Sequence, residues 1–388
     1  MSSWRECKLG DVATFSQGIQ VPLEEQQTEI FENSVRFIRI VDFTKGGENE
    51  IRYIKNPGER YLVNSDDLVM IRYGSQTAGK IARGFNGAIA NNTFKITPEE
   101  NVLNKNFLYY FLSQKSIFDF FHYSQASSTM PAITFGMIGN LDLDIPPLEE
   151  QKAIAEVLSS LDDKIDLLHC QNQTLESLAQ TLFRQWFIEE AKEEWEEKPL
   201  SEIALHVKNN IKPASFENKS FFHFSLPAFD NGQRATKELG SEILSNKYQV
   251  IKNSILVSKL NPRTPRIWLI DESIDEDNSI CSTEFQVLYP KEEIWRGFIY
   301  CFLKTEQAIQ ELAGASSGTS GSHQRVKPED IFNLTFQYPD MDTLKKFDDV
   351  VSDYWRKIKV NQKQIQTLEN LRDTLLPKLL SGEVRVEI

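Results

Sequence analysis

The sequence predicts an α+β fold in which two similar mixed α/β domains are joined by two long antiparallel coiled-coil helices, as an internal pseudo-two-fold repeat. Two observations predict it. The second half of the chain repeats short segments of the first half in the same order. Each half also ends in a long stretch whose apolar residues recur at alternating steps of four and three, which is the spacing of a coiled-coil seam.

The repeat rests on matching segments at a nearly constant offset. WRECKL from Trp4 matches WEEKPL from Trp195, an offset of 191 residues. The same offset relates ANNTFKI to CSTEFQV and FLYYFL to FIYCFL, while ASST and ASSG are offset by 189 and QTLESL and QTLENL by 193. Coincidental similarity between amphipathic segments is the alternative, but it would not keep the order of these matches. We therefore interpret the two halves as copies of one unit.

Each copy consists of a globular part followed by a helical part. The predicted segments are a first domain at 1–146, a central helix at 147–192, a second domain at 193–340, and a C-terminal helix with its tail at 341–388. Alternating and periodic apolar patterns predict strands at Arg36–Val41 and Ser254–Val257 and shorter helices at Phe107–Phe121 and Ile294–Leu312.

The two long helices are predicted to pack against each other. A helix of about 40 residues is about 60 Å long, and its single apolar stripe needs a partner, for which the other copy is the nearest candidate. Pro377 should kink or end the second helix. Asn172 and Asn361 either face each other and fix the register, or each simply occupies a position of the seam that water reaches. The predicted seam comprises Ile154, Leu158, Leu161, Ile165, Leu168, Asn172, Leu175, Leu182, Val351, Ile358, Asn361, Ile365, Leu368 and Leu375.

The composition excludes several classes of protein. Hydrophobic residues make up 40% of the chain and charged residues 26%, which is typical of a globular rather than a disordered protein. The four cysteines are widely scattered, which argues against a zinc site and a disulfide framework. Because neither a signal-peptide core nor an apolar run of membrane-spanning length occurs, we expect a cytoplasmic protein with reduced thiols.

The sequence contains no convincing catalytic constellation. The amino-methyltransferase motifs NPPY and DPPY and a Rossmann glycine pattern are absent, and no convincing nuclease core is found. Gly79-Lys80 is not a phosphate-binding loop, since Ile81 follows where serine or threonine is needed. The five histidines lack the spacing of metal ligands. We therefore expect no catalytic residue and no metal.

Two similar domains separated by a helical spacer suit the reading of two DNA half-sites. YGSQTAGKIAR, from Tyr73, combines glycines for close backbone approach with cations for phosphates; its counterpart SKLNPRTPR, from Ser258, lacks the paired glycines. Serine-rich stretches near Ser127 and Ser316 add residues able to bond base edges. The DNA-binding candidates are Ser75, Gln76, Thr77, Lys80, Arg83, Thr129, Lys259, Arg263, Arg266, His323, Gln324 and Arg325. The alternative is that these loops are solvated and their charges incidental.

The helical segments and parts of both domains resemble a known family. PPLEEQKAIAEVLSSLDDKI from Pro146, LLPKLLSGEVRV from Leu375, FIRIVD from Phe37 and FSLPAFD from Phe224 are similar to segments of the specificity subunits of type I restriction–modification systems. The resemblance implies a DNA-recognition subunit in which each target-recognition domain reads one half of a bipartite asymmetric site. The helices would set the gap and dock methyltransferase subunits, and the tail 382–388 would lead back to the first domain.

The resemblance also implies partners. These are double-stranded DNA, two methyltransferase subunits and restriction subunits, in a complex with methyltransferase and ATP-dependent endonuclease activity. This chain would bind no cofactor; S-adenosylmethionine, ATP and magnesium would be held by the partner subunits. The net charge of −13 counts against DNA binding unless local basic patches or the partners supply positive potential.

Other functions remain open on the sequence alone. The first alternative is a scaffold that holds two interaction domains apart without binding DNA, which the acidic charge favours. A second is the recognition subunit of a related enzyme that both cuts and methylates, and a third is an enzyme in its own right.

Overall fold

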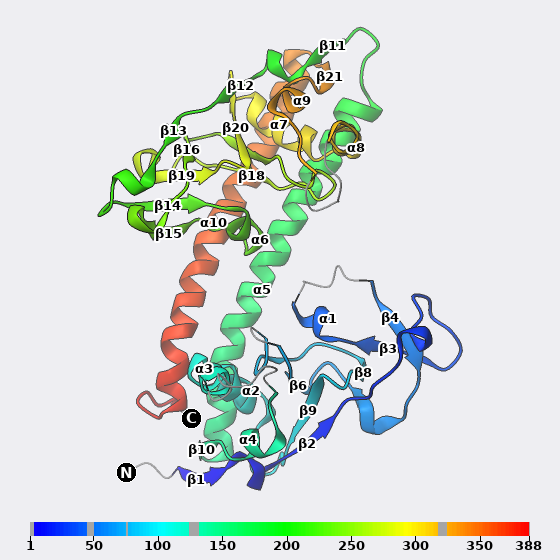
Figure 1. Ribbon diagram of the computed structural model, residues 1–388, viewed down its shortest axis with the longest axis vertical. Coiled ribbons are helices and arrows are strands. Elements are labelled where there is room, and N and C mark those ends of the chain that lie inside the picture. The colour runs from blue at the N-terminus through cyan, green and yellow to red at the C-terminus, as the bar shows by residue number, and fades with distance from the viewer. Residues whose placement is uncertain (1–3, 45–49, 75–76, 124–131, 317–323, 388) are drawn as a thin grey trace. The chain divides into compact units, whose positions relative to one another are not determined.

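The computed structural model describes residues 4–44, 50–74, 77–123, 132–316 and 324–387. The chain divides into two compact units: unit 1 comprises Met1–Leu167 and Gln364–Ile388, and unit 2 comprises Leu168–Lys363. Each unit therefore contains one globular domain and part of both long helices (Figure 1). The predicted α+β class with an internal repeat is confirmed.

The described residues of unit 1 form three small sheets. The first is an antiparallel pair of β1 (Arg5–Lys8) and β10 (Asp142–Ile145). The second is antiparallel throughout, in the order β2 (Ala13–Gln17), β9 (Thr93–Pro98), β6 (Leu68–Ile71) and β7 (Ile81–Ala82). The third has the order β4 (Arg52–Lys55), β3 (Ser34–Ile38), β8 (Gly87–Ile89) and β5 (Leu62–Val63), with β3 and β8 parallel. Its helices are α1 (Ile40–Thr44), α2 (Lys105–Ser113), α3 (Lys115–Tyr123) and α4 (Phe135–Gly139), with single 3₁₀ turns at Leu9–Asp11, Leu23–Glu25 and Glu59–Tyr61.

Unit 2 repeats this topology with one extra edge strand. The antiparallel pair is β11 (Glu196–Pro199) and β21 (Thr335–Tyr338). The antiparallel sheet has the order β12 (Ala204–Val207), β20 (Phe285–Pro290), β17 (Ile255–Ser258) and β18 (Ile267–Leu269). The mixed sheet has the order β13 (Asn210–Ile211), β16 (Lys247–Gln249), β19 (Ser279–Ser282), β14 (Ser220–Phe224) and β15 (Thr236–Leu239). Its helices are α6 (Leu226–Asp230), α7 (Trp295–Leu303), α8 (Glu306–Ala315) and α9 (Pro328–Phe332), with 3₁₀ turns at Leu200–Glu202, Pro213–Ser215, Gly240–Glu242 and Glu276–Asn278.

Three local predictions were wrong in their extent. The predicted helices at Phe107–Phe121 and Ile294–Leu312 are each two helices, α2 with α3 and α7 with α8. The second pair is broken because the hydroxyl of Thr305 accepts a hydrogen bond from the amide of Ala308 and starts a new helix. The strand predicted at Arg36–Val41 ends at Ile38, because Asp42 accepts from the amide of Arg39 and begins α1.

The long helices are α5 (Leu148–Arg184), which continues into a π-helical turn at Gln185–Glu189, and α10 (Met341–Leu380). Their contacts run antiparallel, as predicted. In unit 1, Asp162 accepts from Arg372 at 2.9 Å. In unit 2, the rings of Phe183 and Phe347 lie 5.9 Å apart. Along the helix pair, the residue numbers on α10 therefore fall as the residue numbers of their partners on α5 rise (Figure 1). Every predicted seam residue is buried or half-buried.

The end of α10 lies beyond Pro377, the residue at which the helix was predicted to kink or end. Pro377 does not end α10, which continues to Leu380. A proline so near the end removes only one backbone hydrogen bond, and the amides of Ser381 and Val384 still bond to the carbonyls of Pro377 and Lys378. Gly382 follows the helix with a φ of 73°, and a Cβ added to it would lie 3.3 Å from the ring of Trp4, so the tail does return to the first domain.

We predict that the asparagine pair of the seam contributes to stability. Asn361 is completely buried, and its Nδ2 donates to Asn172 Oδ1 at 2.8 Å. Asn172→Ala leaves that donor with only a longer contact to Gln171, at 3.4 Å, so the free energy of unfolding should fall by about 1–3 kcal/mol. Urea unfolding of the full chain measures the change, with the exposed neighbour Gln173→Ala as the control. Equal stability of the two variants would contradict the prediction.

Candidate nucleic-acid interface

In unit 2, backbone pairing brings two of the predicted DNA-binding segments together. The segment that follows β17 lies beside the segment that precedes α9: the amide of Asn261 donates to the carbonyl of Gln324, and the amide of Val326 donates to the carbonyl of Lys259, both at 3.0 Å. Leu260 and Arg325 form an isolated antiparallel bridge between these two hydrogen bonds. Residues 259–266 and 324–325 therefore form one surface.

Two arginines on this surface are held by carboxylates. Arg266 donates through Nε and Nη2 to Asp230, at 2.7 and 2.9 Å. Arg325 donates through the same two nitrogens to Glu284, at 3.1 Å for both bonds, and the hydrogen bond with Glu284 raises the pKa of Arg325. Among the described residues, the Nη1 of neither arginine has a partner. Each guanidinium is thus held on one edge, and its other edge remains able to donate two hydrogen bonds to a base.

The other candidates of unit 2 differ in accessibility. Arg263 is exposed and makes no ion pair with any described residue, so it is available to a phosphate. Lys259 is half-buried, and desolvation lowers the pKa of its ammonium. The side-chain oxygen of Gln324 is buried without a partner in the described part of the chain. Asn261 has a φ of 51° and directly follows the bridge residue Leu260. In the first copy, Gly74 takes this position, directly after the bridge residue Tyr73.

Unit 1 builds the same surface from the corresponding segments. Tyr73 forms an isolated antiparallel bridge with Ala132, and the amide of Ile133 donates to the carbonyl of Arg72 at 3.0 Å. Gly74, with a φ of 121°, opens a tight turn in which its carbonyl accepts from the amides at positions 77 and 78.

The two cations that follow this turn, Lys80 and Arg83, have different surroundings. Lys80 is exposed and forms no ion pair with any described residue. Arg83 instead packs on α2, where it donates to Asn106 at 2.7 Å and lies 4.3 Å from the centre of the Tyr109 ring. The structure therefore favours Lys80 over Arg83 as a phosphate contact. Thr77 is half-buried, and its hydroxyl donates to the carbonyl of Tyr73. Four further candidates, Ser75, Gln76, Thr129 and His323, lie outside the described residues.

Sequence reasoning missed three residues of these surfaces. Asp230 and Glu284 hold the two arginines of unit 2, and Arg72 donates through Nε to the carbonyl of Ile133 while its guanidinium lies 5.1 Å from the Tyr73 ring. Asp230 is the last residue of the FSLPAFD segment, and Arg72 immediately precedes the YGSQTAGKIAR loop. Their positions beside recognised motifs were the available signal, whereas nothing in the sequence pairs Glu284 with Arg325.

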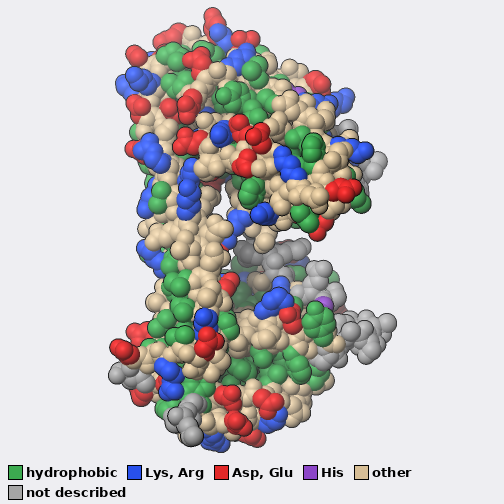
Figure 2. Space-filling model, turned by 90° about the vertical axis from the view of Figure 1, so that its left-hand side faces the viewer, with side chains coloured by type: hydrophobic (Ala, Val, Ile, Leu, Met, Phe, Trp, Pro, Cys, Tyr) green, Lys and Arg blue, Asp and Glu red, His purple; other side chains and the backbone are tan. Residues whose placement is uncertain are grey.

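The surface charge is mixed in sign. Figure 2 shows Lys and Arg side chains interspersed with Asp and Glu on the face that it presents, rather than one continuous basic area. The described residues contain no group of three His, Cys, Asp or Glu side chains placed to hold a metal ion. No helix among the described residues is long and apolar enough to cross a membrane.

Comparisons with known proteins agree with this arrangement. A family model for the type I restriction modification DNA specificity domain matches residues 1–177 and 192–370. The chain is 27% identical over 351 residues to the type I restriction enzyme MjaIX specificity subunit of Methanocaldococcus jannaschii, covering 80% of this chain and 76% of that protein. It is 23% identical over 368 residues to the MjaVIII specificity subunit of the same organism, covering 87% and 83% of the two chains.

A solved structure shares the fold. The crystal structure of the type I restriction–modification system S subunit from M. genitalium superposes with a TM-score of 0.57 at 18% sequence identity. The match covers 100% of this chain and 97% of that chain.

Proposed function

This chain belongs to the family of type I restriction–modification DNA-specificity subunits, and on that premise we propose that each of its globular domains reads one half of a bipartite asymmetric DNA site. One observation carries the proposal. Both domains pair the turn after a central strand, β6 or β17, with the segment before a short helix, α4 or α9. The side chains on the two surfaces differ, since the bridge residue is Ala132 in one domain and Arg325 in the other. Two such surfaces suit two different half-sites.

We propose that Arg266 and Arg325 read bases and that Arg263 and Lys80 contact phosphates. Arginine identifies guanine when two of its donors face O6 and N7, and a guanidinium plane that is fixed beforehand loses less conformational entropy when it binds. Asp230 and Glu284 hold that plane through Nε and Nη2. Arg263 and Lys80 have no such support and are exposed, which suits contact with a flexible, sequence-independent phosphate backbone.

The proposal places the chemistry on partner subunits. We infer that this chain is non-catalytic and that S-adenosylmethionine, ATP and magnesium are bound by methyltransferase and restriction subunits, in a cytoplasmic complex. Two cations of the interface, Arg266 and Arg325, are already paired with carboxylates, so they add little net positive potential. The net charge of −13 therefore makes the chain dependent on its partners for much of the attraction to DNA.

We propose that the paired helices set the gap between the half-sites and dock two methyltransferase subunits. Unit 1 exposes Leu167 on α5 and Leu371 on α10, at 51% and 44% of their surface. Unit 2 exposes Val360 on α10 and Leu178 on α5, at 53% and 44%. The residues of unit 2 correspond to those of unit 1 at an offset of 193 in the repeat. Each unit thus exposes an apolar residue at the same two positions of the repeat, which suits two copies of one partner.

The experiment that tests the proposed function is a domain exchange. The chain is expressed with the methyltransferase subunit of its system, and methylated bases are mapped across the genome. A split motif is expected, and replacing residues 200–340 with those of a relative should change one half of it and leave the other half unchanged. A stable complex without a split motif, or a change in both halves, would contradict the assignment.

Arg325→Ala should relax recognition at one base of one half-site. The loss of two hydrogen bonds to a guanine would reduce discrimination there by about 1–3 kcal/mol. Glu284→Gln should give a smaller loss at the same base, because Arg325 remains but is less firmly held. The ion pair is exposed and contributes no more than about 1 kcal/mol to folding, so both variants should unfold at nearly the wild-type urea concentration.

A matched control separates base reading from phosphate contact. Arg263→Ala should weaken binding to all sequences alike and reduce the slope of log affinity against log salt concentration by about 1. Competition binding of the methyltransferase complex to duplexes that differ at single positions measures both effects. Uniform weakening by Arg325→Ala would show that this arginine is a phosphate contact.

We predict that charge substitutions in one unit remove the methyltransferase docked there and leave the other methyltransferase bound. The pair Leu178→Glu and Val360→Glu places charge on the exposed apolar residues of unit 2 and should reduce the stoichiometry from two methyltransferases to one. The pair Leu167→Glu and Leu371→Glu should do the same in unit 1. Native mass spectrometry counts the bound subunits, and Thr181→Glu, an exposed position on α5, controls for added charge. Loss of both copies in either pair would contradict independent docking.

A further inference from the structure

In unit 2, two lysines follow neighbouring strand ends of the antiparallel sheet. β12 and β17 lie on either side of β20, and each pairs with it in the antiparallel direction. The last residue of β12 lies opposite Val287 and the last residue of β17 lies opposite Phe285, so both strands end beside the first residues of β20. Lys208 follows β12 and Lys259 follows β17. The two lysines therefore leave the sheet at the same end, with only β20 between them.

Neither lysine is neutralised by a carboxylate of its own. Lys208 is exposed and Lys259 is half-buried, and neither forms an ion pair with any described residue. Burial lowers the pKa of Lys259, and Glu284 raises it in part. Arg325 and Lys208 lower this pKa further, because both are cations near the same ammonium. Glu284 already accepts two hydrogen bonds from Arg325. Three cations are therefore gathered around one carboxylate, and a bound anion would relieve their mutual repulsion.

The corresponding positions of unit 1 lack this pair of lysines. In the registers of the two sheets, Gln17 takes the position of Lys208, and Arg72 takes that of Lys259. Gln17 is neutral, and its Nε2 donates to the carbonyl of Asn91 at 3.1 Å. The second cation at this end of the sheet is thus a difference between the two copies.

Two aromatic residues of unit 1 are also replaced by polar residues at this end of the sheet. The ring centres of Phe15 and Phe94 lie 6.4 Å apart. The registers place His206 and Gln286 at the same two positions in unit 2. Gln286 is only 2% exposed; burial lowers the pKa of His206, and a hydrogen bond with Gln286 raises it in part. Because a buried amide contributes less to folding than an aromatic pair, these polar residues favour a binding role for this end of the sheet.

We propose that Lys208 and Lys259 bind a phosphate group of the DNA backbone next to the base read by Arg325. Neighbouring strands lie about 4.8 Å apart, so two long, flexible side chains from either side of β20 can reach one phosphate. The carbonyl of Lys259 accepts from the amide of Val326, so this lysine belongs to the paired segments that carry Arg325. That position favours DNA over an acidic protein segment as the bound anion. The inference rests on the proposed function and adds Lys208 to its contacts.

The test is the salt dependence of DNA binding by the Lys208→Ala variant. The full-length chain in complex with its methyltransferase is titrated with a duplex that carries the split motif and with an unrelated duplex, at several salt concentrations. The variant should weaken binding to both duplexes alike, by about fivefold, and reduce the slope of log affinity against log salt concentration by about 1. Lys208→Arg keeps the charge and should bind as the wild type does.

The stability of the free chain separates a phosphate contact from a structural role. Lys208→Ala removes one of three neighbouring cations, so the melting temperature of the chain without DNA should stay the same or rise. Lys259→Met keeps most of the apolar stem of this half-buried side chain and removes its charge, so it should also weaken binding to both duplexes. A lower melting temperature of Lys208→Ala, without rescue of DNA binding by Lys208→Arg, would show a structural role instead.

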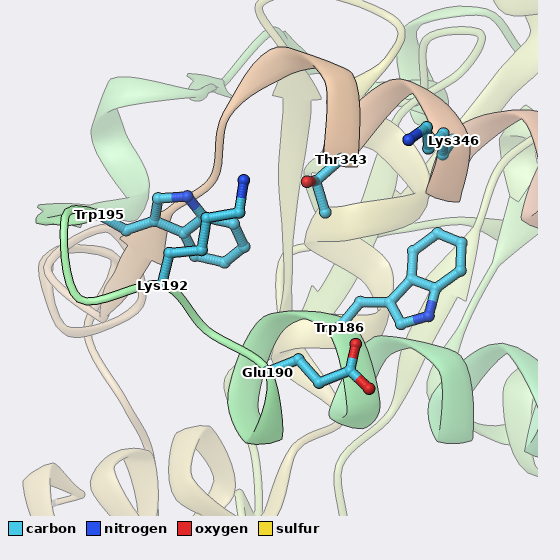
Figure 3. A pocket seen from close by; sticks show the side chains of 6 residues that line it. All are labelled: Trp186, Glu190, Lys192, Trp195, Thr343 and Lys346. Atoms are coloured by element: carbon cyan, nitrogen blue, oxygen red, sulfur yellow. The ribbon is translucent and has the colours of Figure 1, made fainter.

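Lys346→Ala is the matched control for the change in net charge. Lys346 is an exposed lysine of the same unit and forms no ion pair with any described residue. Figure 3 shows it on α10, at a cavity that is also lined by Trp186 and by the carboxylate of Glu190. Because Lys346 is not part of the paired segments at the proposed interface, its removal should leave the salt slope unchanged.

The outcomes that overturn the proposal are distinct. If Lys208→Ala leaves the salt slope unchanged while the split motif is kept, Lys208 contacts no phosphate and the proposed function stands. If it alters the preference at a single base pair, the lysine reads sequence and not the backbone. If it weakens the binding of the methyltransferase in the absence of DNA, the lysines bind an acidic protein surface. If the wild-type complex does not prefer the split motif over the unrelated duplex, both the inference and the proposed function are wrong.

Discussion

The burial of one apolar seam between α5 and α10 is the interaction on which the rest of the structure depends. Each helix has a single apolar stripe and is polar elsewhere, so neither would be stable in water without the other. Because the pairing is antiparallel, each unit contains the beginning of one helix and the end of the other. Leu379 and Leu380 consequently join the core of unit 1, and Phe183 and Phe187 join the core of unit 2.

In each domain, the turn after β6 or β17 pairs with the segment before α4 or α9. This pairing gives the two domains equivalent surfaces with different side chains. In unit 2 this surface carries two arginines whose orientation is set by Asp230 and Glu284. These carboxylates contribute to the acidic net charge, yet they fix the donors that a base reader needs. In the proposed function, the partner subunits supply much of the attraction to DNA, and the net charge of −13 is then compatible with DNA recognition by this chain.

Departures from the repeat are as informative as the repeat itself. Where the first copy has Phe94, the second has Gln286, so a buried aromatic position becomes a polar one between the strand ends that lead to Lys208 and Lys259. The extra edge strand β13 is a second such difference.

The sequence by itself determined the repeat, the fold class and the antiparallel helix pair, because each of these follows from periodicity and order along the chain. It also singled out the segments around residues 73 and 260, each of which pairs with a second segment of its own domain. It also placed Asn172 and Asn361 in one seam, where they hydrogen bond. Only the tertiary structure decided which cations are free. Arg325 is held by Glu284, and Arg83 packs on Tyr109. These facts depend on contacts between residues far apart in sequence, which no local pattern records.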